Sequence, residues 1–364
     1  MTLVPPFIES LIPYQPGKSM AQIRAQYGIE HIVKLASNEN PVGSSPKGIA
    51  AGQAAFHDLQ LYPEAGMLLR SKLAKLFELK LDNVVVGNGS ESILANIVRT
   101  FMCDDEEVLT GEGTFIGIYV AARSRGVKLV TIPLKDYAFD LDAMADAITP
   151  KTKIIYLSNP NNPTGTYFTR AQFERFMERV PRRVVVILDE AYFEYAQDFD
   201  DYPDSMMYRI DNVMTLRTFS KAYGLAAMRI GYGFAHEDLC RNVLKVKLPF
   251  EPSVVAEAGG LGALDDDEFL SVTKATNRAG RLSMPAVYDE LGLKYVPSAA
   301  NFFMLPFETE AEALQFALAL EQRGVIVRPL RGFGLPHCVR ITIGTREQND
   351  TLTAALKEVC SVKA

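Results

Sequence analysis

One lysine and one arginine stand close together within residues 212–234, in a stretch rich in small and hydroxyl-bearing residues. Lys221 follows Ser220, and Arg229 comes eight residues later. A lysine whose pKa is lowered by desolvation or by nearby cations can attack a carbonyl and form a Schiff base. An arginine can hold a phosphate through two parallel N–H donors. The pattern therefore fits an anchor for an aldehyde beside a clamp for a phosphate, although most loop lysines are simply solvated.

Further polar residues follow predicted strands at other places in the chain. Gly89-Ser90-Glu91 opens a helix, where backbone N–H groups form an anion site. Asn162 lies in a loop rich in Pro and Asn, and Asp189 and Tyr192 follow the most apolar strand. Each also has a plain structural interpretation: Asn162 as a turn former, and Asp189 and Ser90 as helix caps. Their joint occurrence with Lys221 favours one shared site.

Composition excludes several classes of function. The chain has 364 residues and a formal net charge of −6, which argues against a nucleic-acid partner. The four cysteines are far apart and show no metal-ligand spacing, so we expect no metal site and no disulfide framework. No apolar run reaches the length of a membrane span, and the first residues do not resemble a signal peptide. We therefore expect a cytoplasmic protein.

Short apolar runs alternate with helical periodicity from residue 84 onward, which predicts an α/β fold with a mostly parallel sheet flanked by helices. Ligands of such sheets bind at the carboxyl ends of the strands. After about residue 250, a long helical stretch is followed by short strands and further helices, which predicts a smaller α/β C-terminal domain. The expected organisation is an N-terminal arm packing with the small domain (1–40), a large domain (41–250) and a small domain (251–364).

The expected elements follow from the same periodicities. Strands are predicted at 31–35, 84–86, 107–110, 128–132, 153–157, 184–188, 213–216, 230–234, 294–296, 301–305, 325–327 and 338–343. Helices are predicted at 19–27, 68–79, 92–102, 116–125, 141–148, 170–179, 267–291, 310–323 and 348–360.

Several short motifs together carry a resemblance to a known family. They are Asn161-Asn162-Pro163-Thr164-Gly165, Asp189-Glu190-Ala191-Tyr192, Ser220-Lys221 with Arg229, and Val339-Arg340-Ile341-Thr342-Ile343-Gly344-Thr345-Arg346. The turn at residues 38–41 and Tyr62-Pro63 add to them. The chain resembles the fold-type I, pyridoxal phosphate (PLP)-dependent aminotransferases of class II, and among them the histidinol-phosphate aminotransferases. The resemblance runs almost from end to end.

The resemblance implies a role for each candidate residue toward the cofactor. Lys221 would form the Schiff base and carry the proton during catalysis, and Asp189 would keep the pyridine nitrogen protonated. Asn162 and Tyr192 would hold the ring hydroxyl, and Phe115 would stack on the ring. Phe115 departs from the family's usual tyrosine. The phosphate would be bound by the backbone amides of Ser90 and Glu91, together with Ser220, Arg229 and Tyr62.

The resemblance also implies substrates and an assembly. Arg340 would bind the substrate's anionic group, assisted by Arg328, Tyr62 and Asn162. Tyr62 would come from the neighbouring subunit, which makes the expected unit a homodimer with shared active sites. The expected partners are small molecules: histidinol phosphate and imidazole-acetol phosphate, exchanging an amino group with glutamate and 2-oxoglutarate.

Other functions compete with this interpretation. Aromatic amino-acid transamination is the nearest alternative, because an imidazole pocket and a phenyl pocket differ little in shape. Threonine-phosphate decarboxylases share the cofactor core and are a second alternative. A non-catalytic regulatory module would need a DNA-binding extension, and no basic segment of that kind is present. A dinucleotide or nucleoside triphosphate site is excluded, because neither glycine-rich motif occurs.

Overall fold

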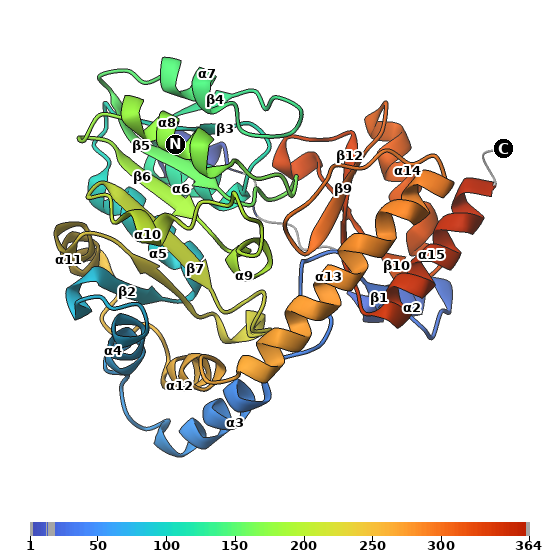
Figure 1. The fold of residues 1–364 in the computed structure, drawn as a ribbon, viewed down its shortest axis with the longest axis horizontal. Coiled ribbons are helices and arrows are strands. Elements are labelled where there is room, and N and C mark those ends of the chain that lie inside the picture. The colour runs from blue at the N-terminus through green and yellow to red at the C-terminus, as the bar shows by residue number, and fades with distance from the viewer. Residues whose placement is uncertain (1–2, 12, 14–18, 362–364) are drawn as a thin grey trace.

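The computed structural model describes residues 3–11, 13 and 19–361 and consists of two parts (Figure 1). A seven-stranded sheet with helices on both sides forms the larger part. A smaller part contains the C-terminal strands and helices, and the long helix α13 extends from one part to the other. The expected N-terminal arm lies partly outside the described residues, at 1–2, 12 and 14–18.

Within the part of the chain that the structure describes, twelve strands form three sheets. Their bounds are β1 Val33–Lys34, β2 Val84–Gly87, β3 Glu107–Gly111, β4 Lys128–Ile132, β5 Thr152–Ser158, β6 Val185–Asp189, β7 Val213–Thr218, β8 Gly231–Phe234, β9 Phe302–Pro306, β10 Val325–Ile326, β11 Arg328–Pro329 and β12 Cys338–Thr342.

The helices lie between and around these strands. Their bounds are α1 Pro6–Glu9, α2 Met20–Tyr27, α3 Pro46–Ala54, α4 Met67–Leu76, α5 Gly89–Phe101, α6 Ile116–Arg125, α7 Leu141–Asp146, α8 Arg170–Arg179, α9 Phe193–Ala196, α10 Ser205–Tyr208, α11 Glu237–Val246, α12 Val254–Ala263, α13 Asp267–Glu290, α14 Glu310–Glu321 and α15 Arg346–Ser361.

The large sheet has the strand order β2-β8-β7-β6-β5-β3-β4. Pairings among β3 to β7 are parallel, whereas β8 pairs antiparallel with both β2 and β7. Six strands therefore end at one edge of the sheet, and β8 begins at that same edge. This architecture confirms the predicted α/β fold, and it gathers the loops that follow the strands at one place.

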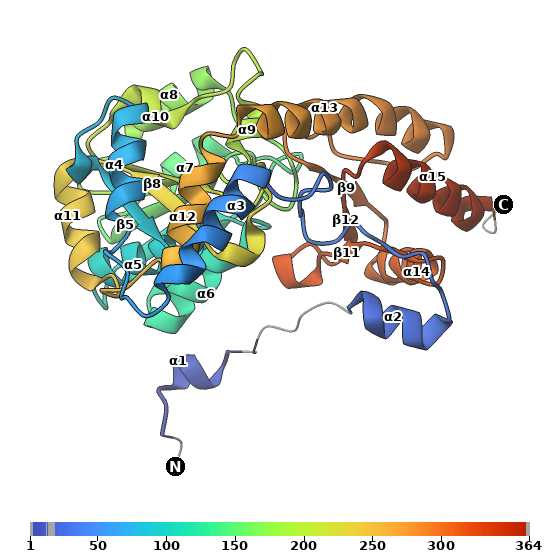
Figure 2. The ribbon, with the colours of Figure 1, turned by 90° about the horizontal axis from the view of Figure 1, so that it is seen from below.

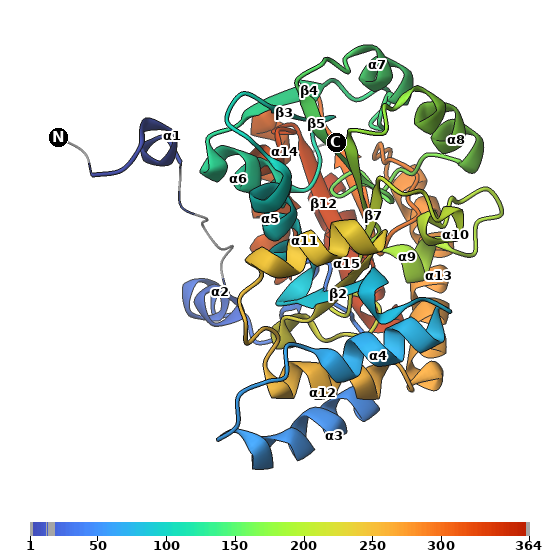
Figure 3. The ribbon, with the colours of Figure 1, turned by 90° about the vertical axis from the view of Figure 1, so that its left-hand side faces the viewer.

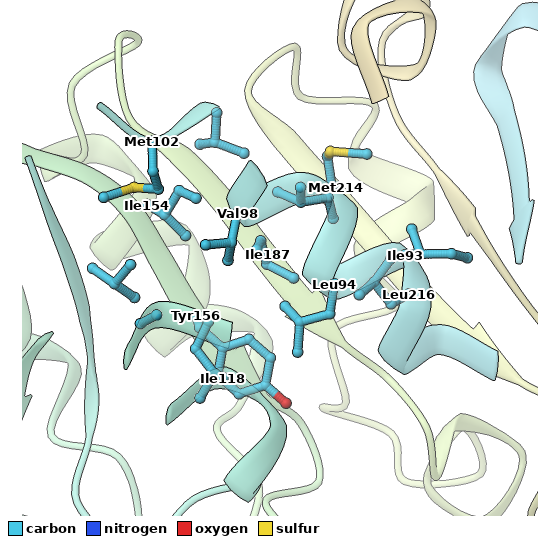
Figure 4. Packing of buried hydrophobic residues seen from close by; sticks show 14 of the residues in the cluster. Ile93, Leu94, Val98, Met102, Ile118, Ile154, Tyr156, Ile187, Met214 and Leu216 are labelled. Carbon is cyan, nitrogen blue, oxygen red and sulfur yellow. The ribbon is translucent and has the colours of Figure 1, made fainter. Parts of the chain in front are cut away.

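Alternating side chains cover the two faces of the sheet, as the pleat of a strand requires. In β5, Ile154 and Tyr156 pack with helices α5, α6 and α11, whereas Ile155 and Leu157 pack with α7 and α8. Figure 4 shows side chains of α5 lying over the first face. Because both faces are buried, the strands are continuously apolar, and this made them recognisable in the sequence.

Helices α3, α4 and α12 pack together below the β2 end of the sheet (Figure 3). Helix α12, at residues 254–263, shares a core cluster with β2 and β8. The chain therefore still packs against the larger part beyond residue 251, where the small domain is predicted to begin. The boundary at 250/251 stays a prediction.

The smaller part is built on the antiparallel sheet β11-β12-β9 and on helices α14 and α15. The pair β1 and β10 is parallel and ties the N-terminal segment to this part, as Figure 2 shows for α2 and the chain after it. In the register of β11 and β12, Arg328 lies directly opposite Arg340. Two predicted substrate-binding residues are therefore cross-strand neighbours on one face of the sheet.

Some elements differ from the predictions. The expected strand 294–296 is wrong: it is reduced to a single bridge between Val296 and Met304. The predictions lack helices α3, α11 and α12 and the four-residue helices α1, α9 and α10. Helices α3 and α12 are rich in glycine, which has a low helix propensity. They need it for close contact, since a Cβ added at Gly262 would lie 2.4 Å from the Lys47 carbonyl oxygen.

A tight turn after β7 sets the position of Lys221. The Gly224 N–H donates to the Lys221 carbonyl oxygen at 3.0 Å, and Gly224 has a positive φ of 69°. A Cβ at Gly224 would lie 2.0 Å from the Gly43 carbonyl oxygen. Only glycine combines this dihedral angle with this close approach.

We expect Gly224→Ala to lower the free energy of unfolding more than Gly292→Ala does. Gly292 has a similar φ of 65° but no neighbour within 4 Å of an added Cβ. The control variant therefore measures the dihedral strain alone, about 1–2 kcal/mol. Urea unfolding of both variants checks this expectation, and equal losses would show that the contact with Gly43 carries no cost.

Candidate active site

Lys221 lies between the sheet edge and the N-terminal segment. Its Nζ donates to the Ser37 carbonyl oxygen at 3.3 Å and stands 5.9 Å from the centre of the Tyr192 ring. Burial, with Arg340 and Arg229 nearby, lowers the pKa of the Lys221 amine to about 8. A substantial fraction of the amine is neutral near that pH, as nucleophilic attack on a carbonyl requires.

Asp189 is the last residue of β6 and is buried. The Tyr156 hydroxyl donates to its Oδ2 at 2.7 Å, and the Ala191 N–H donates to its Oδ1 at 3.2 Å. Burial raises the pKa of Asp189 to about 6, while Tyr156 and Ala191 act in the opposite direction. The carboxyl group can therefore change its charge close to neutral pH and is suited to hold a cationic ring nitrogen.

Tyr192 is held by the N-terminal segment. The Asn38 Nδ2 donates to the Tyr192 hydroxyl at 2.8 Å, which leaves the phenolic proton able to donate elsewhere. Asn38 has a positive φ of 53°, and its N–H donates to Thr342 Oγ1 at 3.0 Å. Asn301 Nδ2 donates to the Asn38 carbonyl oxygen at 3.2 Å. Tyr192 is thus oriented by residues from both parts of the molecule.

Asn162 and Arg340 meet across the two parts. An Nη1–H of Arg340 donates to Asn162 Oδ1, and Nη2 donates to the Ala36 carbonyl oxygen at 3.0 Å. The guanidinium carbon lies 5.3 Å from the Phe302 ring centre and 5.4 Å from that of Phe333. Arg340 is buried, so water screens its attraction for an anion only weakly.

The start of α5 and the start of β8 lie together. Helix α5 begins at Gly89 without a side-chain cap, so its first N–H groups are available to an anion. A Cβ at Gly89 would lie 2.7 Å from Arg229 Nη2, so the absence of a side chain admits the guanidinium. Arg229 Nη2 also lies 3.8 Å from the Glu91 carboxylate.

Two more predicted residues lie near this edge. Ser220 is buried, and its Oγ accepts a hydrogen bond from Thr218 Oγ1 at 3.0 Å, which leaves its own proton to donate. Phe115 is the N-cap residue of α6 and is partly buried against the core, and Gly117 makes room for its ring. The preceding Thr114 donates to Asn161 Oδ1 at 2.8 Å and joins the loop after β3 to the loop after β5.

Tyr62 has different surroundings. Its side chain is 77% exposed and stacks on Phe250 with ring centres 4.2 Å apart. A large exposed aromatic pair of this kind is typical of a contact surface. The structure therefore brings Lys221, Asp189, Tyr192, Asn162 and Arg340 into one region, and it leaves Tyr62 on the surface.

Sequence reasoning assigned no role to Tyr156 or Asn38, which contact Asp189 and Tyr192. Tyr156 stands in an apolar strand and reads as a core residue, although its hydroxyl points to the strand end (Figure 4). The sequence does contain a signal for this contact. A buried tyrosine hydroxyl requires a hydrogen-bond partner, and the strand that follows β5 in the chain ends in an aspartate that can accept the bond.

We expect Tyr156→Phe to raise the pKa of Asp189 above its present value of about 6, because the variant loses a donor that favours the carboxylate. Since the folded pKa already exceeds the ordinary 3.8, the stability that Asp189 contributes to the protein without cofactor is complete below pH 4. It is lost as the pH rises from about 4 through about 6, and the variant raises only the upper limit of this window.

A ¹³C NMR titration of the Asp189 carboxyl carbon measures the shift directly. Tyr167→Phe is a matched control, because it removes a tyrosine–carboxylate bond of 2.8 Å to the surface residue Asp201. An unchanged midpoint in Tyr156→Phe would show that the bond does not influence Asp189.

Comparisons with known proteins bear on this site. Residues 30–356 match the family "Aminotransferase class I and II". The chain is 41% identical over 363 residues to a histidinol-phosphate aminotransferase of Anaeromyxobacter sp. (strain Fw109-5), covering 99% of each chain. It is 41% identical over 359 residues to the histidinol-phosphate aminotransferase of Bacillus subtilis (strain 168), covering 97% of this chain and 98% of the relative.

Solved structures agree with the sequence comparison. The crystal structure of histidinol-phosphate aminotransferase from Sinorhizobium meliloti in complex with pyridoxal-5'-phosphate has a TM-score of 0.87 at 28% identity, covering 100% of this chain and 99% of that one. The aspartate aminotransferase of Thermus thermophilus has a TM-score of 0.84 at 21% identity, with full coverage of both chains, and shares the fold.

Proposed function

The chain belongs to the class I and II aminotransferases, and we propose that it transfers an amino group between histidinol phosphate and 2-oxoglutarate in histidine biosynthesis. The products are imidazole-acetol phosphate and glutamate, and the reaction runs in either direction. The observation that carries the proposal is the meeting of Lys221, Asp189 and Arg340, from both parts of the chain, at the carboxyl edge of the sheet.

The cofactor is pyridoxal phosphate, and the residues present fit it. We propose that the uncapped start of α5, with Ser220 and Arg229, holds the phosphate. The position of Gly89 supports this, because an added Cβ would lie 2.7 Å from Arg229 Nη2, which places the guanidinium at the start of the helix. Lys221 would hold the aldehyde group, Asp189 the ring nitrogen, and Asn162 with Tyr192 the ring hydroxyl. Phe115 would cover one face of the ring.

When bound, the cofactor supplies an electron-withdrawing ring that stabilises negative charge on the substrate carbon. The chain supplies the proton transfers. Lys221, with its pKa lowered to about 8, can take a proton from the substrate carbon and deliver it to the carbon of the cofactor's aldehyde group. Asp189, as a carboxylate, would stabilise the protonated form of the ring nitrogen. The hydrogen bond from Asn38 fixes the orientation of Tyr192, so its hydroxyl proton can point toward the ring hydroxyl.

Arg340 and Arg328 are proposed to bind the anionic group of each substrate in turn. The register of β11 and β12 places them opposite each other on one face of the sheet, so both side chains can act on one anion. A guanidinium accepts a carboxylate or a phosphate in the same bidentate way. The pair therefore suits both glutamate and histidinol phosphate.

We expect histidinol phosphate to convert the bound cofactor to its amino form at a concentration at least ~10-fold lower than phenylalanine requires, since its phosphate adds charge-assisted hydrogen bonds to the arginines. The measurement is a spectral titration of the protein loaded with pyridoxal phosphate. Lys221→Ala is the control that lacks the amine.

The other outcomes separate the competing functions. A stronger response to phenylalanine would replace this substrate by aromatic amino acids. Release of CO₂ from threonine phosphate, without formation of the amino form of the cofactor, would replace transamination by decarboxylation.

We further propose a homodimer in which Tyr62 reaches the phosphate of the neighbouring site. Apolar side chains around Tyr62 are more than half exposed and lie on two segments joined by the Tyr62–Phe250 stack. They are Phe56, Leu59, Leu61, Leu248 and Phe250. A patch of this kind supports a subunit contact. The proposed compartment is the cytoplasm, where the four free cysteines stay reduced.

Mixing two inactive or weakened variants tests the shared site. A hybrid of Tyr62→Ala and Lys221→Ala subunits contains one site with an intact Lys221 and the partner's Tyr62 intact. We expect random mixing to restore up to about one quarter of the wild-type activity. An activity equal to the mean of the two parent variants would place Tyr62 outside the shared site.

A further inference from the structure

A polar cavity lies between α13 and the segment that begins with α9. Its volume is about 170 Å³. Figure 1 shows α9 beside α13, near the junction of the two parts. Among its lining residues are Tyr195 and Phe199 from the first segment and Asn277 and Arg281 from α13. The proposed reaction uses none of these side chains.

Positive charge is concentrated on the α13 side of the cavity. Lys274, Arg278 and Arg281 are four and three residues apart, so they lie on one face of the helix, and all three line the cavity. Lys274 pairs with Asp198 at 2.9 Å. The Arg281 guanidinium stacks over Phe199 at 4.7 Å from the ring centre. Burial and the adjacent Arg278 both lower the pKa of Arg281.

Two buried polar atoms line the same cavity. Asn277 is 6% exposed and Tyr195 is 5% exposed. Asn277 Nδ2 donates to the Ala300 carbonyl oxygen at 3.3 Å, but neither Asn277 Oδ1 nor Tyr195 Oη has a hydrogen-bond partner among the described residues. Asn301 lies close to Tyr195, yet not in hydrogen-bonding geometry. Buried polar atoms left without a partner are unfavourable, so a ligand that satisfies them gains affinity.

We propose that this cavity binds a small oxyanion that also carries a hydroxyl donor, of which hydrogen phosphate is the simplest. The cationic side chains of α13 bind the negatively charged oxygens. Asn277 Oδ1 is an acceptor and needs a donor from the ligand, and the P–OH group supplies one. Sulfate and simple carboxylates have no such donor near neutral pH. The cavity volume of about 170 Å³ is several times the ~30 Å³ that one water molecule occupies, so the cavity has room for a small anion.

The site is separate from the proposed cofactor phosphate site at α5 and adjoins the supports of the active site. Tyr195 lies one helical turn beyond Tyr192, in α9. Asn277 binds the carbonyl of Ala300, and the neighbouring Asn301 donates to the Asn38 carbonyl oxygen. Asn38 in turn donates to Tyr192. The ligand would therefore contact residues that position Tyr192 without entering the reaction site.

Calorimetric titration of the protein loaded with pyridoxal phosphate tests the proposal, with inorganic phosphate and with sulfate at equal ionic strength. We expect phosphate to bind at least ~10-fold more tightly than sulfate. The double variant Arg278→Gln/Arg281→Gln should lose at least ~10-fold in phosphate affinity, with unchanged kcat and KM in phosphate-free buffer. Arg346→Gln, a change at a 96% exposed arginine, is the matched control.

Asn277→Ala provides the second arm, after circular dichroism has verified its folding. Without the acceptor, phosphate should lose its advantage over sulfate. Wild-type phosphate affinity in the double variant would overturn the site. Equal binding of sulfate and phosphate by the wild-type protein would overturn the role of the hydroxyl donor, because the cavity would then hold an anion through charge alone.

Discussion

Burial of charge at the carboxyl edge of the sheet is the constraint on which the rest of the structure depends. Asp189 ends a strand that is covered on both faces, so its carboxylate is removed from water and must be compensated by donors or cations. Tyr156, Ala191 and Lys221 supply this compensation. Burial raises the pKa of the Asp189 carboxyl group and lowers the pKa of the Lys221 amine. Both shifts bring the groups into the range that acid–base chemistry near neutral pH needs.

The next residue, Glu190, is also a buried carboxylate, and an arginine compensates its charge. Its carboxylate accepts from Arg217 Nε and Nη2 at 3.0 and 2.8 Å, and Arg217 also contacts Asp204 at 2.7 Å. This buried network joins the end of β6 to β7 and to the turn before α10. Removing one partner would leave an uncompensated charge in the interior. Two adjacent acids thus have different tasks, one structural and one available for a ligand.

Much of the larger part could be predicted from local sequence, because buried parallel strands are long runs of β-branched and aliphatic residues. Helices α3 and α12 could not be predicted in this way, because their glycines lower the helix propensity. The reason for glycine is a contact between the two helices, where Gly262 lies against Lys47, and local sequence does not show that contact. The candidate site shows the same limit. Lys221 and Asp189 are recognisable by type and position, whereas Tyr156 and Asn38 act through contacts between distant segments. Tyr62 was identified only by resemblance, and its role stays a prediction.

The reversed direction of β8 sets how far apart Lys221 and Arg229 stand. Strand β7 runs up to the edge and β8 leaves from it, so the eight-residue step from Lys221 to Arg229 begins and ends at that edge. The amine and the guanidinium are therefore separated by a short closed loop of defined length. Inserting or deleting one residue in this loop would change the distance between the amine and the guanidinium, and so their match to the fixed size of the cofactor, without replacing either residue.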